Sequence, residues 1–503
     1  MNTNMLYYGD NLDVLRRHIK DESVDLIYLD PPFNSNANYN VLFAEHDGSQ
    51  AAAQIKAFND TWHWDQTAAQ AYQEVVETGG NASKAMQAFR MFLGDSDLLA
   101  YLAMMTPRLI ELRRVLKSTG SIYLHCDPTA SHYLKMLMDA VFGAKQYLNE
   151  IIWYYGPKAT QRSISFQRKH DIIFLYSKSK GEHLFTSPLQ EYSESSLTER
   201  ETRYSPQDEK GRRYRLTTRR NKEGQKYRAK IYLNEGVVMT DVWQIPILNA
   251  TAKERLGYPT QKPESLLERI IKASSNEGDI VLDPFCGCGT TITVAQRLNR
   301  NWIGIDITHL AITLIKNRLQ DAFNSQAVYQ VIGEPVSLPD AEDLAASDPY
   351  QFQWWALGLV GARPVEQKKG SDKGIDGRIY FHDEAEGGKT KQVILSVKAG
   401  HTGVAHLHEL RGVIEREHAE IGVLIAMQDP TAPMRTEAAG AGFYFSPGWN
   451  KSYPKLQVLT IADLLDHKGV VDMPPLHEVN VTFKKAPKAK DNGPQSTQIS
   501  FDD

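Results

Sequence analysis

The residues best suited to chemistry occur where an apolar run ends in an acid and two prolines. Residues 24–29 are mostly apolar, and they are followed by Asp30, Pro31, Pro32 and Phe33. The run predicts a buried parallel strand, which must end at the prolines because they lack the N–H that a sheet needs. In open α/β sheets, ligands bind at the carboxyl ends of the strands. Asp30 is therefore expected at a ligand site.

This tetrapeptide suits one reaction in particular. The exocyclic amino group of a nucleobase is a weak nucleophile, because its lone pair is delocalised into the ring. The carboxylate of Asp30 and the carbonyl of Pro31 would localise that lone pair by accepting hydrogen bonds from the two N–H groups. Phe33 would stack on a base flipped out of the duplex. The other interpretation is a strand ended by prolines, whose acid caps a following helix. The tetrapeptide alone does not decide between them.

A second group of candidate residues lies some 250 positions further along. Residues 279–291 predict a short strand ending in Asp283, a Gly-X-Gly turn at Gly287 and Gly289, and the start of a helix. The glycines would let the backbone approach a ligand closely. The next predicted strand ends in Asp306, 23 residues after Asp283. That spacing is near the one at which an acid holds ribose hydroxyls in dinucleotide-binding folds.

Together, the two segments resemble the amino-group DNA methyltransferases that use S-adenosylmethionine. Residues 30–33 match the family's catalytic motif, and residues 285–289 match its cofactor loop. The catalytic motif comes first, which is the β-type order, and the resemblance covers about residues 5–325. A motif that begins with Asp favours adenine N6, since the cytosine N4 enzymes more often begin it with Ser. The departures are Phe33, where Tyr is commonest, and two cysteines in the cofactor loop.

The resemblance implies roles for further residues. S-adenosylmethionine would lie across the loop, with Asp306 on its ribose and Asp10 on its adenine. Asp10 is also placed to cap a helix that begins near residue 12, and both roles can hold. A Lys-Pro segment that contains Lys262 would close over the methionine end. The cofactor-binding set predicted in this way is Asp10, Lys262, Asp283, Phe285, Gly287, Gly289, Thr290 and Asp306.

A basic segment interrupts the alternation of strands and helices at residues 177–245. Within it, residues 201–230 hold eleven Lys or Arg against four acids, with three tyrosines interleaved. Such a segment suits phosphate contacts and base readout, and it lies where the family places its target-recognition region. A charge run can also be a solvated face, but we favour contact with double-stranded DNA. The predicted DNA-binding residues are Arg212, Arg213, Arg215, Arg219 and Arg220.

A second domain is predicted at residues 347–470, after a linker at 326–346. It resembles Mrr-like restriction endonucleases of the PD-(D/E)XK type, in which a metal carboxylate lies beside a strand that ends in Lys. The matching residues are Asp376 and Lys398. Ser396 stands where a second acid or an amide is expected, and Gln353 stands where the first helix often supplies Glu. Only Asp376 would be a strong Mg²⁺ ligand, so both cleavage and a non-cleaving DNA-binding fold stay open.

Composition limits what the elements around these residues can be. A chain of 503 residues should hold two or three domains, and 42% hydrophobic with 23% charged residues is ordinary for a soluble protein. There is no apolar run near 18 residues and no signal peptide, so we expect neither a membrane protein nor an exported one. The three cysteines show no disulfide or zinc spacing, which fits a cytoplasmic protein. With a net charge of −4, DNA contact must come from local patches.

The predicted fold class is α/β. A Rossmann-like methyltransferase sheet over residues 1–325 carries the recognition insert, and a smaller restriction-endonuclease-like α/β domain follows. Residues 34–95 are too long for an ordinary loop and predict a lid or a DNA-contacting insert. The tail at 471–503 is expected to be disordered. Its residues 498–501 faintly resemble peptides that dock on sliding clamps, although a chance match is favoured, and a homodimer also stays open.

Two rival functions stay open at this stage. One is methylation of RNA or protein, against which the size of the basic insert argues. The other is a DNA-binding module with a dead active site, which cofactor binding without turnover would favour.

Overall fold

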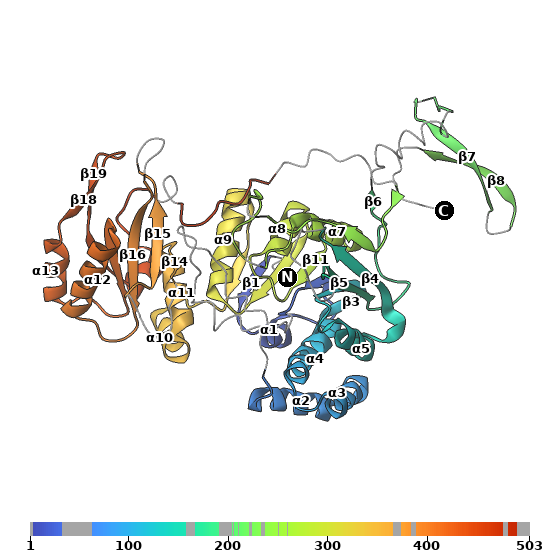
Figure 1. The fold of residues 1–503 in the computed structure, drawn as a ribbon, viewed down its shortest axis with the longest axis horizontal. Helices are drawn as coiled ribbons and strands as arrows, with labels where there is room; N and C mark the ends of the chain where they lie inside the picture. Colours follow the sequence, from blue (N-terminus) through green and yellow to red (C-terminus); the bar gives the residue numbers. More distant parts are fainter. Residues whose placement is uncertain are drawn as a thin grey trace.

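The chain folds into two α/β bodies, and a hairpin projects from the first of them (Figure 1). In this computed structural model no described helix is long and apolar enough to cross a membrane. Residues 33–62, which include Phe33, and the clamp-like residues 498–501 lie outside the described part. The described residues are 4–32, 63–156, 166–190, 204, 206–209, 211–220, 224–232, 237–249, 251–258, 260–365, 374–383, 389–475 and 481–489.

The first body is built on a nine-stranded sheet with the order β10-β4-β5-β3-β2-β11-β12-β1-β13. Its neighbouring strands run parallel, except that β5 is antiparallel to both β3 and β4. The predicted Rossmann-like sheet is therefore confirmed. Its strands are β1 (Met5–Tyr8), β2 (Val24–Leu29), β3 (Leu116–Cys126), β4 (Tyr147–Tyr154), β5 (His170–Ser177), β10 (Val242–Gln244), β11 (Ile280–Asp283), β12 (Asn301–Asp306) and β13 (Gln330–Ile332).

Helices cover both faces of this sheet, so it has two hydrophobic cores. The apolar residues of the parallel strands alternate between these cores, as strands buried on both faces do. The helices on one face are α1 (Asn11–His18), α2 (Gln66–Thr78), α3 (Gly80–Leu93), α4 (Asp97–Val115) and α5 (Ser131–Phe142). Those on the other face are α7 (Glu264–Ser274), α8 (Thr290–Arg297) and α9 (His309–Phe323).

The described part of the predicted insert at 34–95 is helical. Helices α2 and α3 pack on α4 and bury residues such as Tyr72, Met86 and Phe89. Trp64 packs edge-on against Tyr72, with the Arg90 guanidinium 5.2 Å from the centre of its ring. The described part of this stretch is therefore a helical pair packed on the folded body, not an open loop.

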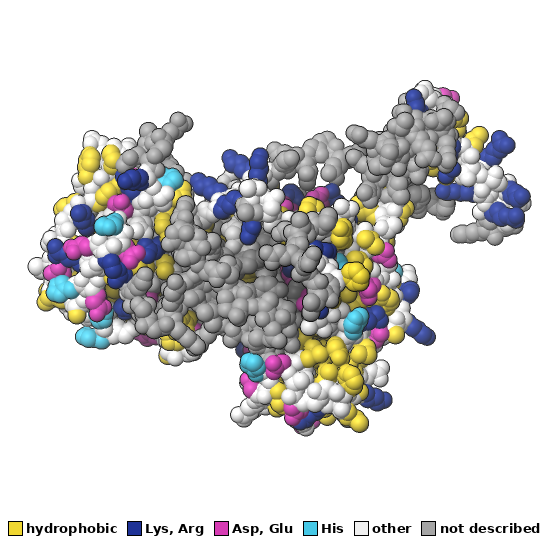
Figure 2. Space-filling view, viewed as in Figure 1, with side chains coloured by type: hydrophobic (Ala, Val, Ile, Leu, Met, Phe, Trp, Pro, Cys, Tyr) yellow, Lys and Arg dark blue, Asp and Glu magenta, His cyan; other side chains and the backbone are white. Residues whose placement is uncertain are grey.

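The basic segment contains a two-stranded antiparallel hairpin, β7 (Tyr214–Arg220) and β8 (Lys226–Tyr232). At its base, β6 (Leu189–Gln190) pairs with β9 (Val237–Val238). Most side chains on both faces of the hairpin are exposed. Such an isolated ribbon has little core of its own to hold it. Figure 2 shows Lys and Arg side chains gathered on it.

The second body has a five-stranded sheet of order β14-β15-β16-β17-β20 between helices. The smaller α/β domain predicted from the sequence is therefore present. Its strands are β14 (Arg363–Pro364), β15 (Gly377–Phe381), β16 (Lys391–Lys398), β17 (Ile421–Ala426), β20 (Leu456–Thr460) and the pair β18 (Phe443–Ser446) with β19 (Lys451–Pro454). Its helices are α10 (Leu338–Ser347), α11 (Pro349–Leu359), α12 (Val404–Glu417), α13 (Ala432–Gly440) and α14 (Ile461–Leu465).

Two stretches differ from what the sequence predicted. The expected linker at 326–346 contains β13, which pairs with β1 in the first sheet, and most of α10, which packs on α11. Part of the expected disordered tail, residues 481–489, has a defined path. Within it, the Ala486 N–H donates to Asp321 Oδ2 at 3.0 Å, and the Ala489 N–H donates to the Ala322 carbonyl at 3.1 Å.

Candidate active site

Four acids lie at the carboxyl ends of four adjacent strands. Asp30 follows β2, Asp283 ends β11, Asp306 ends β12, and Asp10 follows β1 by two residues. They are far apart in the sequence, but the sheet order β2-β11-β12-β1 places them along one edge. All four line one cavity of about 750 Å³. The sequence predicted this convergence, because the carboxyl ends of parallel strands share an edge.

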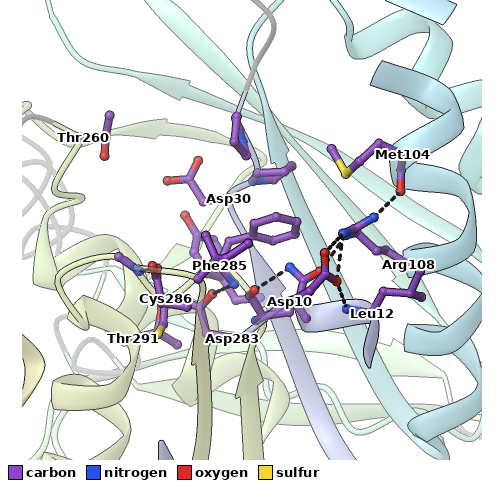
Figure 3. Close-up of a pocket in the computed structure, with 18 of the residues that line it drawn as sticks. Asp10, Leu12, Asp30, Met104, Arg108, Thr260, Asp283, Phe285, Cys286 and Thr291 are labelled. Carbon is purple, nitrogen blue, oxygen red and sulfur yellow. Dashed lines mark hydrogen bonds and ion pairs between the residues drawn. The ribbon is translucent and has the colours of Figure 1, made fainter. Parts of the chain in front are cut away.

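Other predicted residues line the same cavity. They are Pro31, Pro32, Lys262, Phe285, Gly287 and Thr290. Figure 3 shows Phe285 between Asp30 and Asp10. Gly289 is absent from the lining, and Phe33 lies outside the described residues.

Asp30 is held between two partners at the end of β2. Its Oδ2 accepts a hydrogen bond from Lys262 Nζ, and its side chain keeps 16% exposure. Its Oδ1 is buried, has no hydrogen-bond partner among the described residues, and lies 3.5 Å from His125 Nδ1. The oxygen that an incoming amino group would contact is therefore Oδ2, which accepts the hydrogen bond from Lys262. Lys262, predicted to bind cofactor, contacts the predicted catalytic acid in this structure.

His125, which the sequence did not single out, lies fully buried behind Asp30. Its Nε2 is 3.1 Å from Asp171 Oδ2, and its Nδ1 is 3.0 Å from the Tyr28 hydroxyl. Burial works to raise the pKa of Asp171, but the hydrogen bond and charge of His125 outweigh it and lower that pKa overall. Burial raises the pKa of Tyr28 well above its usual range, so its hydroxyl stays protonated. His125 therefore bridges Tyr28 and Asp171 directly behind Asp30.

Asp10 does what its helix-capping role predicts. Its Oδ1 accepts the Leu12 N–H at 2.7 Å, at the N-terminus of α1. Arg108 of α4 also donates to Asp10, at 2.8 and 3.0 Å, and to the Met104 carbonyl at 2.9 Å (Figure 3). Arg108 lines the cavity but gave no signal in the sequence, because it is one basic residue on a long helix. Contact between Asp10 and an adenine stays a prediction.

The glycine loop brings its backbone close to the cavity. Gly287 has φ +50°, and its N–H donates to Asp306 Oδ2 at 2.9 Å. A Cβ at this position would lie 3.2 Å from the ring of Tyr258, which closes over the loop. Gly289 has φ +74° and a conformational role, since its Cβ would lie 2.7 Å from Ile315. Both glycines are thus required by backbone conformation and close packing.

Burial shapes the acid–base behaviour of the two loop acids. Desolvation raises the pKa of Asp306 to about 6, against hydrogen bonds from Thr308 and Gly287 that lower it. Desolvation likewise raises the pKa of Asp283 to about 7, and Asp283 accepts hydrogen bonds from the Thr291 hydroxyl and the Phe285 N–H. Asp283 therefore shapes the loop from within as well as lining the cavity.

The cavity fits S-adenosylmethionine. Its volume is in the range of small-ligand sites. Gly287 lets the backbone approach closely, and Asp306 and Asp10 can accept hydrogen bonds from ribose and adenine. The acids at the carboxyl edge of the sheet also suit a ligand that carries two positively charged groups, a sulfonium and an ammonium. Several residues of α2 and the turn before it complete the wall: His63, Asp65, Thr67, Ala68 and Ala71.

The predicted DNA-binding arginines all lie on or just before the β7–β8 hairpin. Arg212 pairs with Asp208, and its guanidinium is 4.4 Å from the centre of the Tyr232 ring. The Arg215 guanidinium is 5.5 Å from the centre of the Tyr204 ring. Arg219 and Arg220 are exposed near the far end of β7. The tyrosines therefore stiffen two of the arginines and leave their charge outward.

The predicted nuclease residues Asp376, Ser396 and Lys398 come together in the second body. Asp376 Oδ1 accepts from Gln353 Nε2 at 2.9 Å. Its Oδ2 accepts from the Ser396 hydroxyl at 3.1 Å and the Val397 N–H at 2.7 Å, with Lys398 Nζ 3.9 Å away. Among the described residues, no three His, Cys, Asp or Glu side chains gather to hold a metal ion. Asp376 is the single carboxylate in this donor set, so an Mg²⁺ site is not supported, and cleavage by this body stays an open prediction.

Family comparison defines the class of protein. A family model described as "DNA methylase", of the N6 and N4 methyltransferases, matches residues 24–317, more than half of the chain. The chain belongs to this DNA methylase family. A second model, "NACHT-associated inactive Restriction Endonuclease 1", matches residues 350–466. The expected restriction-endonuclease relationship is thus found, whereas an active Mrr-like domain is not confirmed.

Individual relatives agree with the family. The chain is 32% identical over 214 residues to the type II methyltransferase M.HpaI of Haemophilus parainfluenzae, covering 42% of this chain and 58% of that protein. It is 29% identical over 322 residues to the DNA adenine methyltransferase YhdJ of Escherichia coli, covering 64% and 84%. Among solved structures, PvuII cytosine-N4 DNA methyltransferase aligns at 16% identity and a TM-score of 0.36, covering 62% and 86%.

Proposed function

We propose that this chain methylates the exocyclic amino group of a base in double-stranded DNA, with adenine N6 as the target. The observation that carries the proposal is the single cavity that holds both Asp30 and the glycine loop, segments some 250 residues apart. S-adenosylmethionine supplies a methyl group on a positively charged sulfur. The protein's task is to position the two reactants in line.

Asp30 does the central work in this proposal. The Asp30 carboxylate accepts a hydrogen bond from one N–H of the target amino group, and the Pro31 carbonyl accepts a hydrogen bond from the other N–H. The nitrogen lone pair is then directed toward the methyl group. Lys262 leaves or shares Oδ2 when the base arrives, because that oxygen is the one next to the cavity. His125, whose Nδ1 lies 3.5 Å from Oδ1, holds the carboxylate in place and is a positioning residue.

Two observations favour adenine. The catalytic motif begins with Asp30, and the chain is similar to YhdJ, which is named as an adenine methyltransferase. Cytosine N4 is the alternative. The type II methyltransferase M.HpaI supports a place in a restriction–modification system. The hairpin supports duplex DNA as substrate, because a two-stranded β-ribbon fits the major groove.

For the second body, we propose DNA contact or regulation without cleavage. Both oxygens of Asp376 already accept hydrogen bonds from the protein, and Ser396 supplies no second charge. A metal ion would have to displace these donors and would find one carboxylate only.

The test is modification-sensitive sequencing of unmodified DNA treated with the pure protein and S-adenosylmethionine. We expect methyl groups on adenine N6 within one recurring sequence, and far fewer of them after the same treatment time with an Asp30→Asn variant. Methylcytosine at N4 would correct the base. RNA or protein labelling that outcompetes DNA, or cofactor binding without any methylation, would refute the proposed function.

A further inference from the structure

The second body reaches the rim of the cofactor cavity through helix α11. Trp354 of α11 is buried in a cluster with Tyr258 and Cys288 of the first body, and Phe483 of the C-terminal segment packs against the same cluster. Tyr258 and Cys288 both line the cavity. The ring that closes over Gly287 therefore belongs to a hydrophobic cluster that a residue of the other body helps to build, together with Leu310 and Leu314 of α9.

A second contact from α11 lies at the start of α9. Gln351 Oε1 accepts the N–H of His309 at 3.1 Å in a buried position. The preceding residue, Thr308, donates from its N–H and its hydroxyl to Asp306 Oδ1 at 3.0 and 2.9 Å. Asp306 in turn accepts the Gly287 N–H. Gln351 is thus linked to the backbone of the glycine loop through three hydrogen-bonded contacts and the peptide bond between Thr308 and His309.

The two helices cannot shift past one another freely. A Cβ at Gly358 of α11 would lie 2.6 Å from Thr313 Oγ1 of α9, so the backbone of α11 lies close against α9. Packed interfaces of this kind transmit displacement, because they have few voids to absorb it.

From these contacts we propose that Gln351 and Trp354 are positioning residues for the cofactor site, so that the restriction-endonuclease-like body completes the methyltransferase. Trp354 completes the hydrophobic cluster that keeps Tyr258 over Gly287, and Gln351 fixes the first turn of α9, which follows Asp306. This inference rests on the proposed function, because it assigns S-adenosylmethionine to the cavity. By linkage, any ligand of the second body that moves α11 changes cofactor affinity, and cofactor changes affinity for that ligand by the same factor.

The test compares two tryptophans on the same helix in the full chain. In Trp354→Ala, calorimetry should show S-adenosylmethionine bound about tenfold more weakly, with kcat at saturating cofactor within about threefold of wild type. Trp355→Ala is the matched control, because Trp355 is buried within the second body's own core. It should lose similar stability in thermal unfolding with cofactor affinity unchanged. Trp354→Phe should restore most of the affinity.

Gln351 gives an independent measurement. Gln351→Glu keeps an acceptor for the His309 N–H, whereas Gln351→Leu does not, so only the latter should speed hydrogen exchange at the first turn of α9 and weaken cofactor binding. Equal affinities in Trp354→Ala and Trp355→Ala, or unchanged exchange in Gln351→Leu, would overturn the proposal. If the wild-type chain bound no S-adenosylmethionine, the proposed function would fail, while the exchange experiment would still report on the Gln351 contact.

Discussion

Replacing Asp30 with Asn tests the centre of the proposed site, since the side chain keeps its shape and loses its charge. Asp30 and Lys262 form an ion pair whose side chains retain only 16% and 12% exposure. Breaking a fully buried pair costs about 3–5 kcal/mol, so this partly open pair should cost roughly 2 kcal/mol of unfolding free energy. Asn can also no longer offer a charged acceptor to the target amino group. Losing one such preorganised interaction should lower kcat by about 10²–10³-fold.

The control for this variant is Lys262→Met. It breaks the same ion pair, and should therefore lose similar stability, but it keeps the Asp30 carboxylate and should keep kcat within about tenfold. The double variant should be more stable than the sum of the two single losses predicts, because neither charge is then left alone. Methyl transfer to duplex DNA, thermal unfolding and calorimetry with cofactor would be measured on all four proteins. If Asp30→Asn methylated DNA at a rate near wild type, the reasoning about the amino group would be refuted.

Four further predictions follow from other parts of the molecule. Arg219→Ala with Arg220→Ala should lower the salt slope of DNA binding by about two, and an unchanged slope would mean that these charges are only solvated. Because the pKa of Asp306 is raised to about 6, its ionised form is lost below that pH. Cofactor affinity should fall there as pH is lowered, and Asp306→Asn should remove this step from the calorimetric profile. Gly289→Ala should lose about 1–3 kcal/mol in denaturant unfolding through its positive φ and the clash with Ile315, and a neutral result would contradict this. Incubation with Mg²⁺ or Mn²⁺ should cut neither methylated nor unmethylated DNA on a gel, and specific fragments from either would show that the second body is active.

The position of these acids at one edge of the sheet could be predicted from the sequence, because each acid comes at the end of an apolar strand. Asp30, Asp283 and Asp306 carry that signal, and a parallel sheet must bring such ends to one edge. Arg108 and His125 could not be found in this way. Arg108 depends on how α4 crosses α1, and His125 is a polar residue inside an apolar strand, which gives a position but no partner.

Long-range packing accounts for the remaining differences. The stretch at 326–346 has a weak apolar pattern, yet it supplies an edge strand to one sheet and a helix to the other body. The cluster that joins Trp354 to Tyr258 could not be predicted either, because both residues are of types common in any hydrophobic core. The sequence gives no measure of which core a buried tryptophan joins.

The place of β1 in the sheet has a consequence for how the chain is made. β1 holds residues 5–8, but both of its neighbours, β12 and β13, come after residue 300. At about 5–20 residues per second, roughly 15–60 seconds of synthesis separate the first strand from its partners. Throughout that interval the apolar β1 segment has no partner strand on either of its edges. If translation stops before β12, the released fragment lacks both strands that pair with β1. Such fragments should be prone to aggregation and should depend on chaperones.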